Sequence, residues 1–395
     1  MRELTMKTIF VLTVLLLLGV AADPAARLYA QCPPCGGVPQ TITTDHWTMQ
    51  VVRPCLTQAT TAGGRGGGIE IRNVRYRNAV ASPFRNVIFK AHTPIINVKY
   101  QNDGCGPFRL WTYQESPYIC TGTADTVNGR CNGVATTNCN NPPGGDVGTF
   151  CGVTVDTTTY PGILIFTTVV RASWFRFQLE WHFHQEGTIR PAIKWTASNH
   201  PCLQTKSLDM VYWRIDWDIE GSIPNQIEEL NLWGVAPAPD YWLTWDPLFV
   251  EMNRMRDGFA GRWYRVRNTN TNRAYIMFPP EFWTEDPDGS ATAPGIADIW
   301  ALRYNTALQE ETDDCAAPLG GVAFCSLGGS AGYWPHLSRF IDQTSDSTFL
   351  LARDVVTWYG ASHIRPAVPA GTPTAGDCNR VTGPFLTPDP AGPAW

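Results

Sequence analysis

The stretch WFRFQLEWHFH, residues 174–184, alternates apolar and polar side chains without interruption. The apolar side chains are those of Phe175, Phe177, Leu179, Trp181 and Phe183. The polar side chains between them are those of Arg176, Gln178, Glu180, His182 and His184. Because successive side chains of a β-strand point to opposite faces, this period of two predicts a strand with one buried face.

Further strands are predicted on either side of this stretch. Residues 185–188 (QEGT) supply a turn, and residues 189–195 return as the second strand of a hairpin. Residues 211–219 alternate in the same way, and residues 354–359 form a short apolar run rich in β-branched side chains. Short segments of this kind recur along the chain and predict an antiparallel sheet.

Helical periodicity is scarce, and residues 225–233 and 297–302 are the only helix candidates. We therefore predict an all-β fold, a large antiparallel β-sandwich with long disulfide-stapled loops, over residues 69–395. Residues 31–68, which are rich in Cys and Gly, are predicted to form a short segment before it.

The composition excludes several classes of protein. The chain has 395 residues, of which 46 are aromatic, 5 are Lys and 16% are charged, with a formal net charge of −5. Five lysines are too few for a coiled coil or a long helical bundle. The acidic balance argues against a nucleic-acid binder, and 44% hydrophobic residues argue against global disorder.

The N-terminus predicts export. Residues 1–30 carry Arg2 and Lys7 ahead of an apolar run at residues 9–22, the pattern of a cleaved signal peptide. No later segment reaches about 18 consecutive apolar residues, so we expect no transmembrane segment in the mature chain. We therefore expect a secreted, periplasmic or extracellular protein.

The cysteine count supports that compartment. All 12 Cys follow residue 30, and an even count in an exported chain predicts disulfide bonds. Cys32 and Cys35 have the C-x-x-C spacing of redox and zinc sites, which is an alternative role for that pair.

Three carboxylates form the first candidate site. Asp216 and Asp218 stand two apart on one strand and point the same way, and Asp354 opens another strand. If the two strands are neighbours, the three carboxylates meet, and such oxygen ligands suit Ca²⁺. The alternative is a solvated face on which Arg214 neutralises Asp216.

Histidines form the other candidates. His182 and His184 share one strand face with Glu180, a spacing that can chelate zinc or copper but that a surface strand also produces. His363 follows a buried strand and is by itself typical of a hydrogen-bonded loop residue. The sequence contains no G-x-S-x-G, G-x-G-x-x-G or Walker motif.

Four blocks of the sequence resemble the catalytic β-sandwich domain of copper amine oxidases, in that family's order. They bracket roughly residues 70–395, and the family's smaller N-terminal domains are not expected in this chain. The blocks are RNVIFKAHTPIINVKY (85–100), WHFHQEGTI (181–189), RIDWDIEG (214–221) and DVVTWYGASH (354–363). The resemblance implies oxidation of primary amines with one copper ion and a quinone (topaquinone) made from a tyrosine of the chain itself.

The resemblance also implies where that machinery stands. Counting back from the hairpin places the quinone tyrosine at Phe175, which lacks a phenolic oxygen, so topaquinone is not expected. Counting back from Asp216 places two copper histidines at Ser207 and Asp209. Only His363 matches a copper ligand, and one His with one Asp is a poor copper(II) site, which argues against copper.

Two further positions follow from the resemblance. Asp146 resembles the family's catalytic base, although the segment after it is far shorter than in the family. The family's peripheral calcium-type site falls on Asp216, Asp218 and Asp354, so calcium is the cation expected there. Such an ion would clamp two strands that are distant in sequence.

These observations predict an exported amine oxidase-like sandwich without amine oxidase activity, acting as a binding or structural module. Its partner would be a protein, a surface or a second copy, a role that suits its 16 Trp, although these also fill a large core. The alternative is an oxidoreductase acting on primary amines with a metal site rebuilt on His182 and His184, or on His363 with Asp209. A carbohydrate-surface binder is a third possibility, and an exposed row of Trp would favour it.

Overall fold

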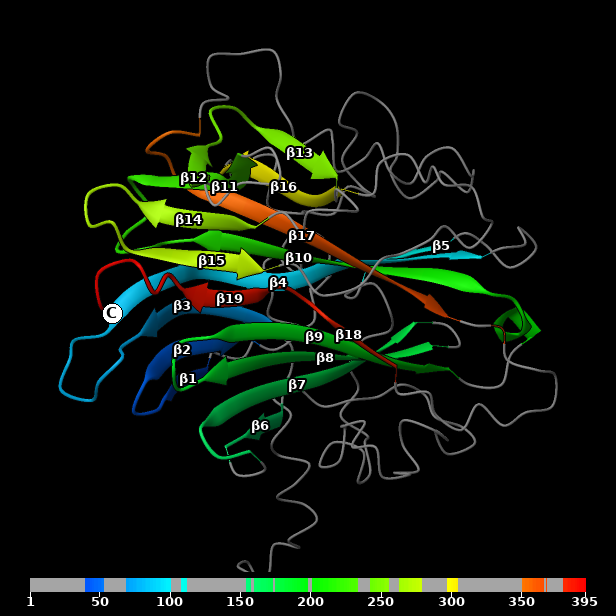
Figure 1. The fold of residues 1–395 in the computed structure, drawn as a ribbon. Coiled ribbons are helices and arrows are strands. Elements are labelled where there is room, and N and C mark those ends of the chain that lie inside the picture. The colour runs from blue at the N-terminus through cyan, green and yellow to red at the C-terminus, as the bar shows by residue number, and fades with distance from the viewer. Residues whose placement is uncertain are drawn as a thin grey trace, which may run out of the picture.

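A computed structural model gives the structure of a large part of the chain. The residues that it describes are 40–52, 69–100, 108–111, 154–157, 160–172, 175–197, 201–233, 242–255, 263–278, 297–304, 350–365, 367 and 379–395. These residues form two antiparallel sheets and one short 3₁₀ helix, Pro201–Gln204 (Figure 1).

The first sheet, sheet A, has its strands in the order β1-β2-β3-β4-β10-β17-β16-β13, and β5 pairs with β4. Its strands are β1 (Gln40–Thr43), β2 (Trp47–Val52), β3 (Glu70–Tyr76), β4 (Arg85–Tyr100), β5 (Phe108–Trp111), β10 (Ser207–Trp217), β13 (Met252–Met255), β16 (Ala297–Arg303) and β17 (Val355–Arg365). Strand β10 lies at the centre, between β4 and β17.

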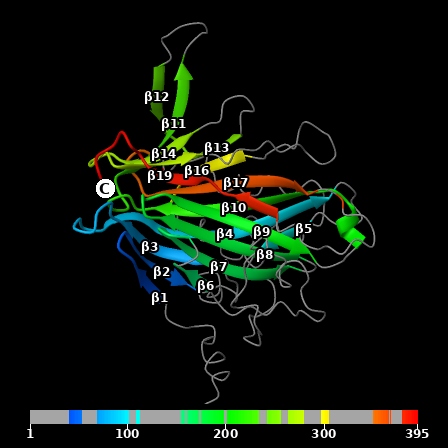
Figure 2. The same cartoon turned by 60° about the horizontal axis from the view of Figure 1, so that its bottom comes forward.

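The second sheet, sheet B, has the order β12-β11-β14-β15-β19-β9-β8-β7-β6, and β18 pairs with β9. Its strands are β6 (Thr154–Asp156), β7 (Ile163–Ala172), β8 (Phe175–His184), β9 (Ile189–Ala197), β11 (Asn225–Trp233), β12 (Trp242–Pro247), β14 (Tyr264–Asn268), β15 (Ala274–Phe278), β18 (Asn379–Thr382) and β19 (Phe385–Pro388). The β11–β12 hairpin stands out from the rest of the sandwich (Figure 2).

Aromatic side chains join the two sheets. Trp47 of sheet A packs edge-on against Phe183 of sheet B, with ring centroids 5.1 Å apart. Trp217 of sheet A lies 6.2 Å from Tyr275 of sheet B, and Trp395 packs 4.9 Å from the same tyrosine. Full burial of each large apolar side chain contributes about 1.5–3 kcal/mol, so these rings help to hold the two sheets together.

The predicted all-β sandwich is confirmed. The alternating stretch that suggested it forms β8, and its return strand forms β9, in continuous antiparallel register from Phe175 opposite Ala197 to Phe183 opposite Ile189. The apolar face of β8 lies in the core, where Leu179, Trp181 and Phe183 are each about 1% exposed.

Both helix predictions are wrong. Residues 225–233 form strand β11 and residues 297–302 fall within strand β16. Each pairs along its length with neighbouring strands, β11 with β12 and β14, and β16 with β13 and β17. Sheet pairing and burial outweigh a weak local preference for helix in segments this short.

The sheet also extends into the segment that the sequence placed outside the sandwich. Strands β1 and β2 lie within residues 31–68, and β2 pairs with β3 from Trp47 opposite Tyr76 to Val52 opposite Glu70. Sheet A therefore includes strands that precede Ile69. No helix in the described part of the chain has the length and apolar character needed to cross a membrane.

The β8–β9 turn requires a glycine. Gly187 has a φ of 100°, a conformation that other residues rarely adopt. A Cβ atom there would lie 2.6 Å from Cγ of Pro388 and 2.8 Å from the ring of Tyr76. The turn thereby packs closely against both the C-terminal segment and sheet A.

Candidate functional site

The positions where the sequence implied copper ligands come together in the fold. Ser207 and Asp209 lie at the start of β10, and His363 lies near the end of β17. Asp209 is directly opposite His363 in the strand pairing, and Ser207 is opposite Arg365. The count along the sequence therefore placed the three residues at one end of two neighbouring strands.

The residues at this corner do not fit a copper site built from three imidazoles. A serine hydroxyl and a carboxylate stand where two histidines would be needed, and copper(II) prefers nitrogen ligands. Phe175 begins β8 on the facing sheet and has no oxygen from which a quinone could be made. Asp146, the candidate base, lies outside the described residues.

The acidic candidates gather at the opposite end of the same two strands. The β10–β17 pairing ends with Trp217 opposite Val355, so Asp218 and Asp354 flank its last pair. Burial, together with the charges of Asp216 and Asp218, raises the pKa of Asp354 to about 7. The charges of Asp216 and Asp218 therefore act on Asp354, which lies on the neighbouring strand side.

Nearby side chains partly compensate this negative charge. Burial raises the pKa of Asp218 to about 6, although Arg75 and a 3.2 Å hydrogen bond from Asn86 act in the opposite direction. Arg214 lies 3.6 Å from Asp216 in a fully buried ion pair. The neutralisation of Asp216 by Arg214 is therefore present, but on a buried face and not on the solvated face of the alternative prediction.

The acidic cluster is not a preformed metal site. Oδ1 of Asp354 is buried and makes no hydrogen bond with any described residue. However, within the described ranges no three His, Cys, Asp or Glu side chains lie close enough together to hold a metal ion. A cation would have to draw the three carboxylates closer to one another.

His182 has a carboxylate partner. Its Nε2 lies 2.8 Å from Oε2 of Glu180, and the other oxygen of Glu180 accepts hydrogen bonds from Lys194 at 2.7 Å and Gln178 at 2.5 Å. Burial by itself would raise the pKa of Glu180, but the hydrogen bond from His182 and the charge of Lys194 outweigh it and lower that pKa to about 2.

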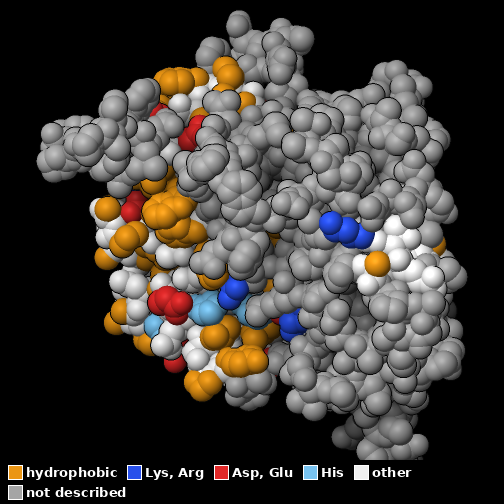
Figure 3. Space-filling model, turned by 45° about the vertical axis from the view of Figure 1, so that its right-hand side comes forward, with side chains coloured by type: hydrophobic (Ala, Val, Ile, Leu, Met, Phe, Trp, Pro, Cys, Tyr) orange, Lys and Arg blue, Asp and Glu red, His pale blue; other side chains and the backbone are white. Residues whose placement is uncertain are grey.

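His184 lies further along the same face, in a more open position. Its Nδ1 is 3.5 Å from Glu186. Burial lowers the pKa of His184, Glu186 opposes that effect, and His182 and Arg190 add to it. Figure 3 shows histidine side chains at the surface beside acidic and basic ones. A neighbouring arginine disfavours a bound cation, so the geometry adds no support to a metal chelate here.

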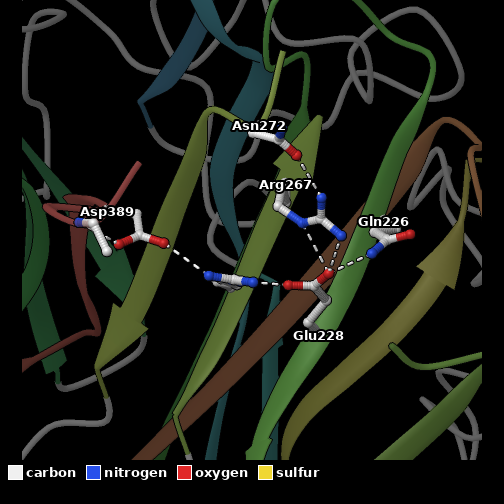
Figure 4. Close-up of polar contacts among 7 residues, drawn as sticks. Gln226, Glu228, Arg267, Asn272 and Asp389 are labelled. Atoms are coloured by element: carbon white, nitrogen blue, oxygen red, sulfur yellow. Dashed lines mark hydrogen bonds and ion pairs between the residues drawn. The ribbon is translucent and has the colours of Figure 1, made fainter. Parts of the chain in front are cut away.

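A further polar cluster was missed by sequence reasoning. Glu228 on β11 is buried and accepts hydrogen bonds from Gln226, Arg265 and Arg267 (Figure 4). Arg265 also donates to Asp389 at 2.9 Å, which ties β14 to the C-terminal segment. The strand pairing of Glu228 with Arg265 would have indicated this network, but residues 225–233 were one of the two helix candidates and no strand was predicted there.

The comparisons with known proteins agree with the fold. No protein-family model and no curated protein matches the sequence. Among solved structures, the chain is similar to a copper-containing benzylamine oxidase from Hansenula polymorpha (TM-score 0.56, 13% identity, 90% of this chain and 61% of that chain). It is also similar to Aspergillus nidulans amine oxidase (TM-score 0.53, 13% identity, 88% of this chain and 51% of that chain).

The sandwich resembles the copper amine oxidase domain in fold. A third similar structure, the Pichia pastoris lysyl oxidase, has a TM-score of 0.50 at 12% identity, over 88% of this chain and 51% of that chain. This chain therefore spans between about half and 61% of the length of these oxidases. Identity this low establishes the fold alone, and the chemistry depends on the residues at the site.

The fold therefore resembles that of amine oxidases, but the residues at this corner are not those that the resemblance implied for amine oxidation. Sheet A carries Ser207, Asp209 and His363 at the end of β10 and β17, and sheet B carries Phe175 at the start of β8. None of these except His363 is a residue type that the resemblance implied for amine oxidation. At the other end of β10, all three implied calcium ligands are present as aspartates.

Proposed function

We propose that this chain is an exported amine oxidase-like β-sandwich that does not oxidise primary amines and acts as a binding or structural module. The observation that carries the proposal is the pairing of Asp209 with His363 across β10 and β17. It supports the alignment that assigns two copper positions to Ser207 and Asp209. The same alignment assigns the quinone position to Phe175.

The chemistry of these residues supports the absence of amine oxidation. A self-made quinone requires a phenolic oxygen, and a phenylalanine ring offers none. A site with one imidazole, one carboxylate and one hydroxyl holds copper(II) more weakly than one with three imidazoles. Both losses concern groups that the reaction needs, so restoring only one of them would not restore activity.

Metal content tests the copper part of the proposal. The secreted full chain would be incubated with copper, dialysed against a chelator and measured by elemental mass spectrometry. We expect the wild-type chain to retain no stoichiometric copper and the double variant Ser207→His with Asp209→His to retain more. Ser82→His, in the exposed loop before β4, is the matched control and should behave as wild type.

Two results would contradict this proposal. Stoichiometric copper or zinc in the wild-type chain would mean that the ligands were assigned to the wrong residues. Amine-dependent peroxide in addition would favour the alternative, an amine oxidoreductase with a rebuilt metal site. Copper-free protein without turnover would exclude that alternative.

A second proposal concerns Asp216, Asp218 and Asp354, which would bind Ca²⁺ and clamp β10 to β17. The specific observation is that Asp218 and Asp354 flank the last β10–β17 pair and that Oδ1 of Asp354 is buried without a hydrogen bond to any described residue. Repulsion from Asp216 and Asp218 adds to burial in raising the pKa of Asp354. A divalent cation would relieve this repulsion, and carboxylate oxygens are its preferred ligands. The ion would contribute stability rather than chemistry.

Thermal unfolding with calcium and with a chelator tests the clamp. Calcium should raise the unfolding temperature of the wild-type chain but not of Asp354→Asn. Glu186→Gln, which removes an exposed carboxylate elsewhere, should keep the calcium response. An equal calcium response in Asp354→Asn, or none in the wild type, would count against the clamp.

Export, disulfide bonds and partners remain predictions. Intact mass spectrometry of secreted protein, before and after reduction, would locate the cleavage site and count the bonds. Light scattering after gel filtration would reveal a second copy as the partner. A monomer would leave a different protein or a surface as the partner. Among the tryptophans whose side-chain burial is described, Trp263 is the one that is exposed, so no row of exposed Trp supports a carbohydrate surface among them.

A further inference from the structure

A cavity of about 290 Å³ opens at one edge of the sandwich. It lies where the β1–β2 turn of sheet A approaches β7 and the end of β8 in sheet B. Its lining residues are Thr44, Asp45, His46, Trp47, Thr157, Gly162, Ile163, Leu164, Phe183 and Gln185. None of these takes part in the copper, quinone, calcium or histidine positions considered above.

Hydrogen bonds hold the walls of this cavity in place. Nε1 of Trp47 donates to the carbonyl of His184 at 2.8 Å, which joins the β1–β2 turn to the end of β8. The backbone N–H of Gln185 donates to the carbonyl of Gly162 at 2.9 Å. Arg77 donates to the carbonyl of Asp45 at 2.7 Å. The backbone around the cavity is therefore preorganised, which lowers the entropic cost of binding.

The hydroxyl of Thr44 in the lining accepts a hydrogen bond from the backbone N–H of Trp47 at 3.0 Å, whereas three exposed residues of the lining have uncommitted polar ends. The carboxylate of Asp45, the amide of Gln185 and the hydroxyl of Thr157 make no hydrogen bond or ion pair with any residue in the described part of the chain. His46 uses Nδ1 at 3.1 Å from the carbonyl of Arg77. Because a carbonyl only accepts, that nitrogen is the donor, and Nε2 of a neutral His46 is left as an acceptor.

The lining limits the chemistry of a ligand. It contains no Lys or Arg and one carboxylate, so an anion would meet repulsion without compensation. A wholly apolar ligand would bury the polar ends of Asp45 and Gln185 without hydrogen bonds. Ile163, Leu164 and Phe183 supply an apolar wall beside these polar groups. A ligand with several hydroxyl groups and a C–H face matches both parts of the lining.

We infer that this cavity binds a small neutral polyhydroxy compound of about the size of a hexose. A space of about 290 Å³ is far larger than the roughly 30 Å³ of one water, so a ligand of this size has room to enter. Hydroxyl groups both donate and accept, so they can satisfy the carboxylate, the amide and the imidazole together. This inference does not depend on the loss of amine oxidation.

Saturation-transfer NMR on the full chain tests the inference. The probes are D-glucose, D-galactose, D-mannose and myo-inositol, together with methylammonium chloride and sodium phosphate. We expect saturable binding of at least one polyhydroxy probe. Asp45→Ala and Gln185→Ala should each weaken it by tenfold or more, since each removes hydrogen bonds to the ligand.

The control variant is Glu186→Gln, which lies on the same turn, is 61% exposed and is outside the cavity lining. It should bind as wild type, and circular dichroism would establish that all variants are folded. Three results would overturn the inference: no saturable binding of any polyhydroxy probe, unchanged binding in both cavity variants, or binding of methylammonium or phosphate alone.

Discussion

Replacing Glu180 by Gln removes the charge at the centre of the cluster on β8. The side chain of Glu180 is 3% exposed, and Lys194 and His182 hold its two oxygens at 2.7 and 2.8 Å. The variant keeps the shape and volume of the side chain. It removes the carboxylate charge that lies 2.7 Å from the Lys194 ammonium group, which is 15% exposed. We therefore expect a loss of stability without a rearrangement of the core.

The magnitude follows from the titration of Glu180. Its pKa falls from 4.5 to about 2 on folding, which corresponds to about 3 kcal/mol at neutral pH. A lowered carboxyl pKa contributes stability that is fully present above the unfolded value of 4.5 and lost as the pH falls toward about 2. Breaking a buried ion pair by removing one partner costs about 3–5 kcal/mol, which agrees in size.

Urea unfolding of the wild-type chain and Glu180→Gln, at pH 7 and at about pH 3.5, is the assay. The free energy of unfolding should differ by about 3 kcal/mol at pH 7 and by about 2 kcal/mol at pH 3.5. Glu186→Gln, whose carboxylate is exposed, should change it by less than about 1 kcal/mol. A difference below about 1 kcal/mol for Glu180→Gln, or one that is independent of pH, would refute the reasoning.

Three other substitutions have expected outcomes. Without calcium, Asp354→Asn should raise the unfolding temperature at pH 8 and have little effect near pH 4. The pKa of Asp354 rises from the ordinary value of 3.8 to about 7 on folding, so the wild-type chain loses stability as the pH rises from 3.8 through 7. Glu228→Gln should lower the free energy of unfolding in urea by about 2–4 kcal/mol, since two arginines lose a buried counter-ion but are themselves partly exposed. Gly187→Ala should cost more than about 2 kcal/mol in the same assay, because its φ is positive and Pro388 fills the space. An unchanged unfolding temperature for Asp354→Asn at pH 8, or an unchanged urea midpoint for either of the other variants, would contradict the contact on which that prediction is based.

The sheets could be predicted where one face of a strand is buried and the other polar. Residues 174–184 satisfy this condition, and β8 begins and ends within one residue of the predicted bounds. Only the second half of strand β10 was predicted, because the alternation of apolar and polar side chains does not continue before Val211. The pairing of β10 with β17 nevertheless extends to Ser207. Strands β11 and β16 carry no such alternation, and only their pairing partners determine their structure.

The sequence located the candidate residues on two strands that do pair, but it could not predict the contacts of their side chains. Asp209 and Asp216 are seven residues apart on β10, and their partners His363 and Val356 are seven apart on β17, so a gapless count located both ends of the strand pair. The partner of His182 could not be predicted in this way. Glu180 reaches Lys194 on the neighbouring strand, and such cross-strand contacts depend on register.

The edge cavity could not be predicted from the sequence either, because it depends on contacts between distant segments. Its polar groups come from the β1–β2 turn, the segment before β7 and the end of β8, which are far apart in the sequence. Thr44 and His46 fall in a segment that the sequence placed outside the sandwich. No local pattern at these residues indicates a site, because the cavity exists only where the edges of two sheets approach one another.

The most direct test of an amine oxidase-like fold without amine oxidation is peroxide production by the copper-loaded full chain. Hydrogen peroxide would be measured with benzylamine and with methylamine as substrates, against chain-free buffer containing the same copper. We predict no amine-dependent peroxide, because Phe175 cannot form the quinone and Ser207 and Asp209 do not supply the copper ligands. Peroxide production that saturates with amine concentration would contradict this conclusion.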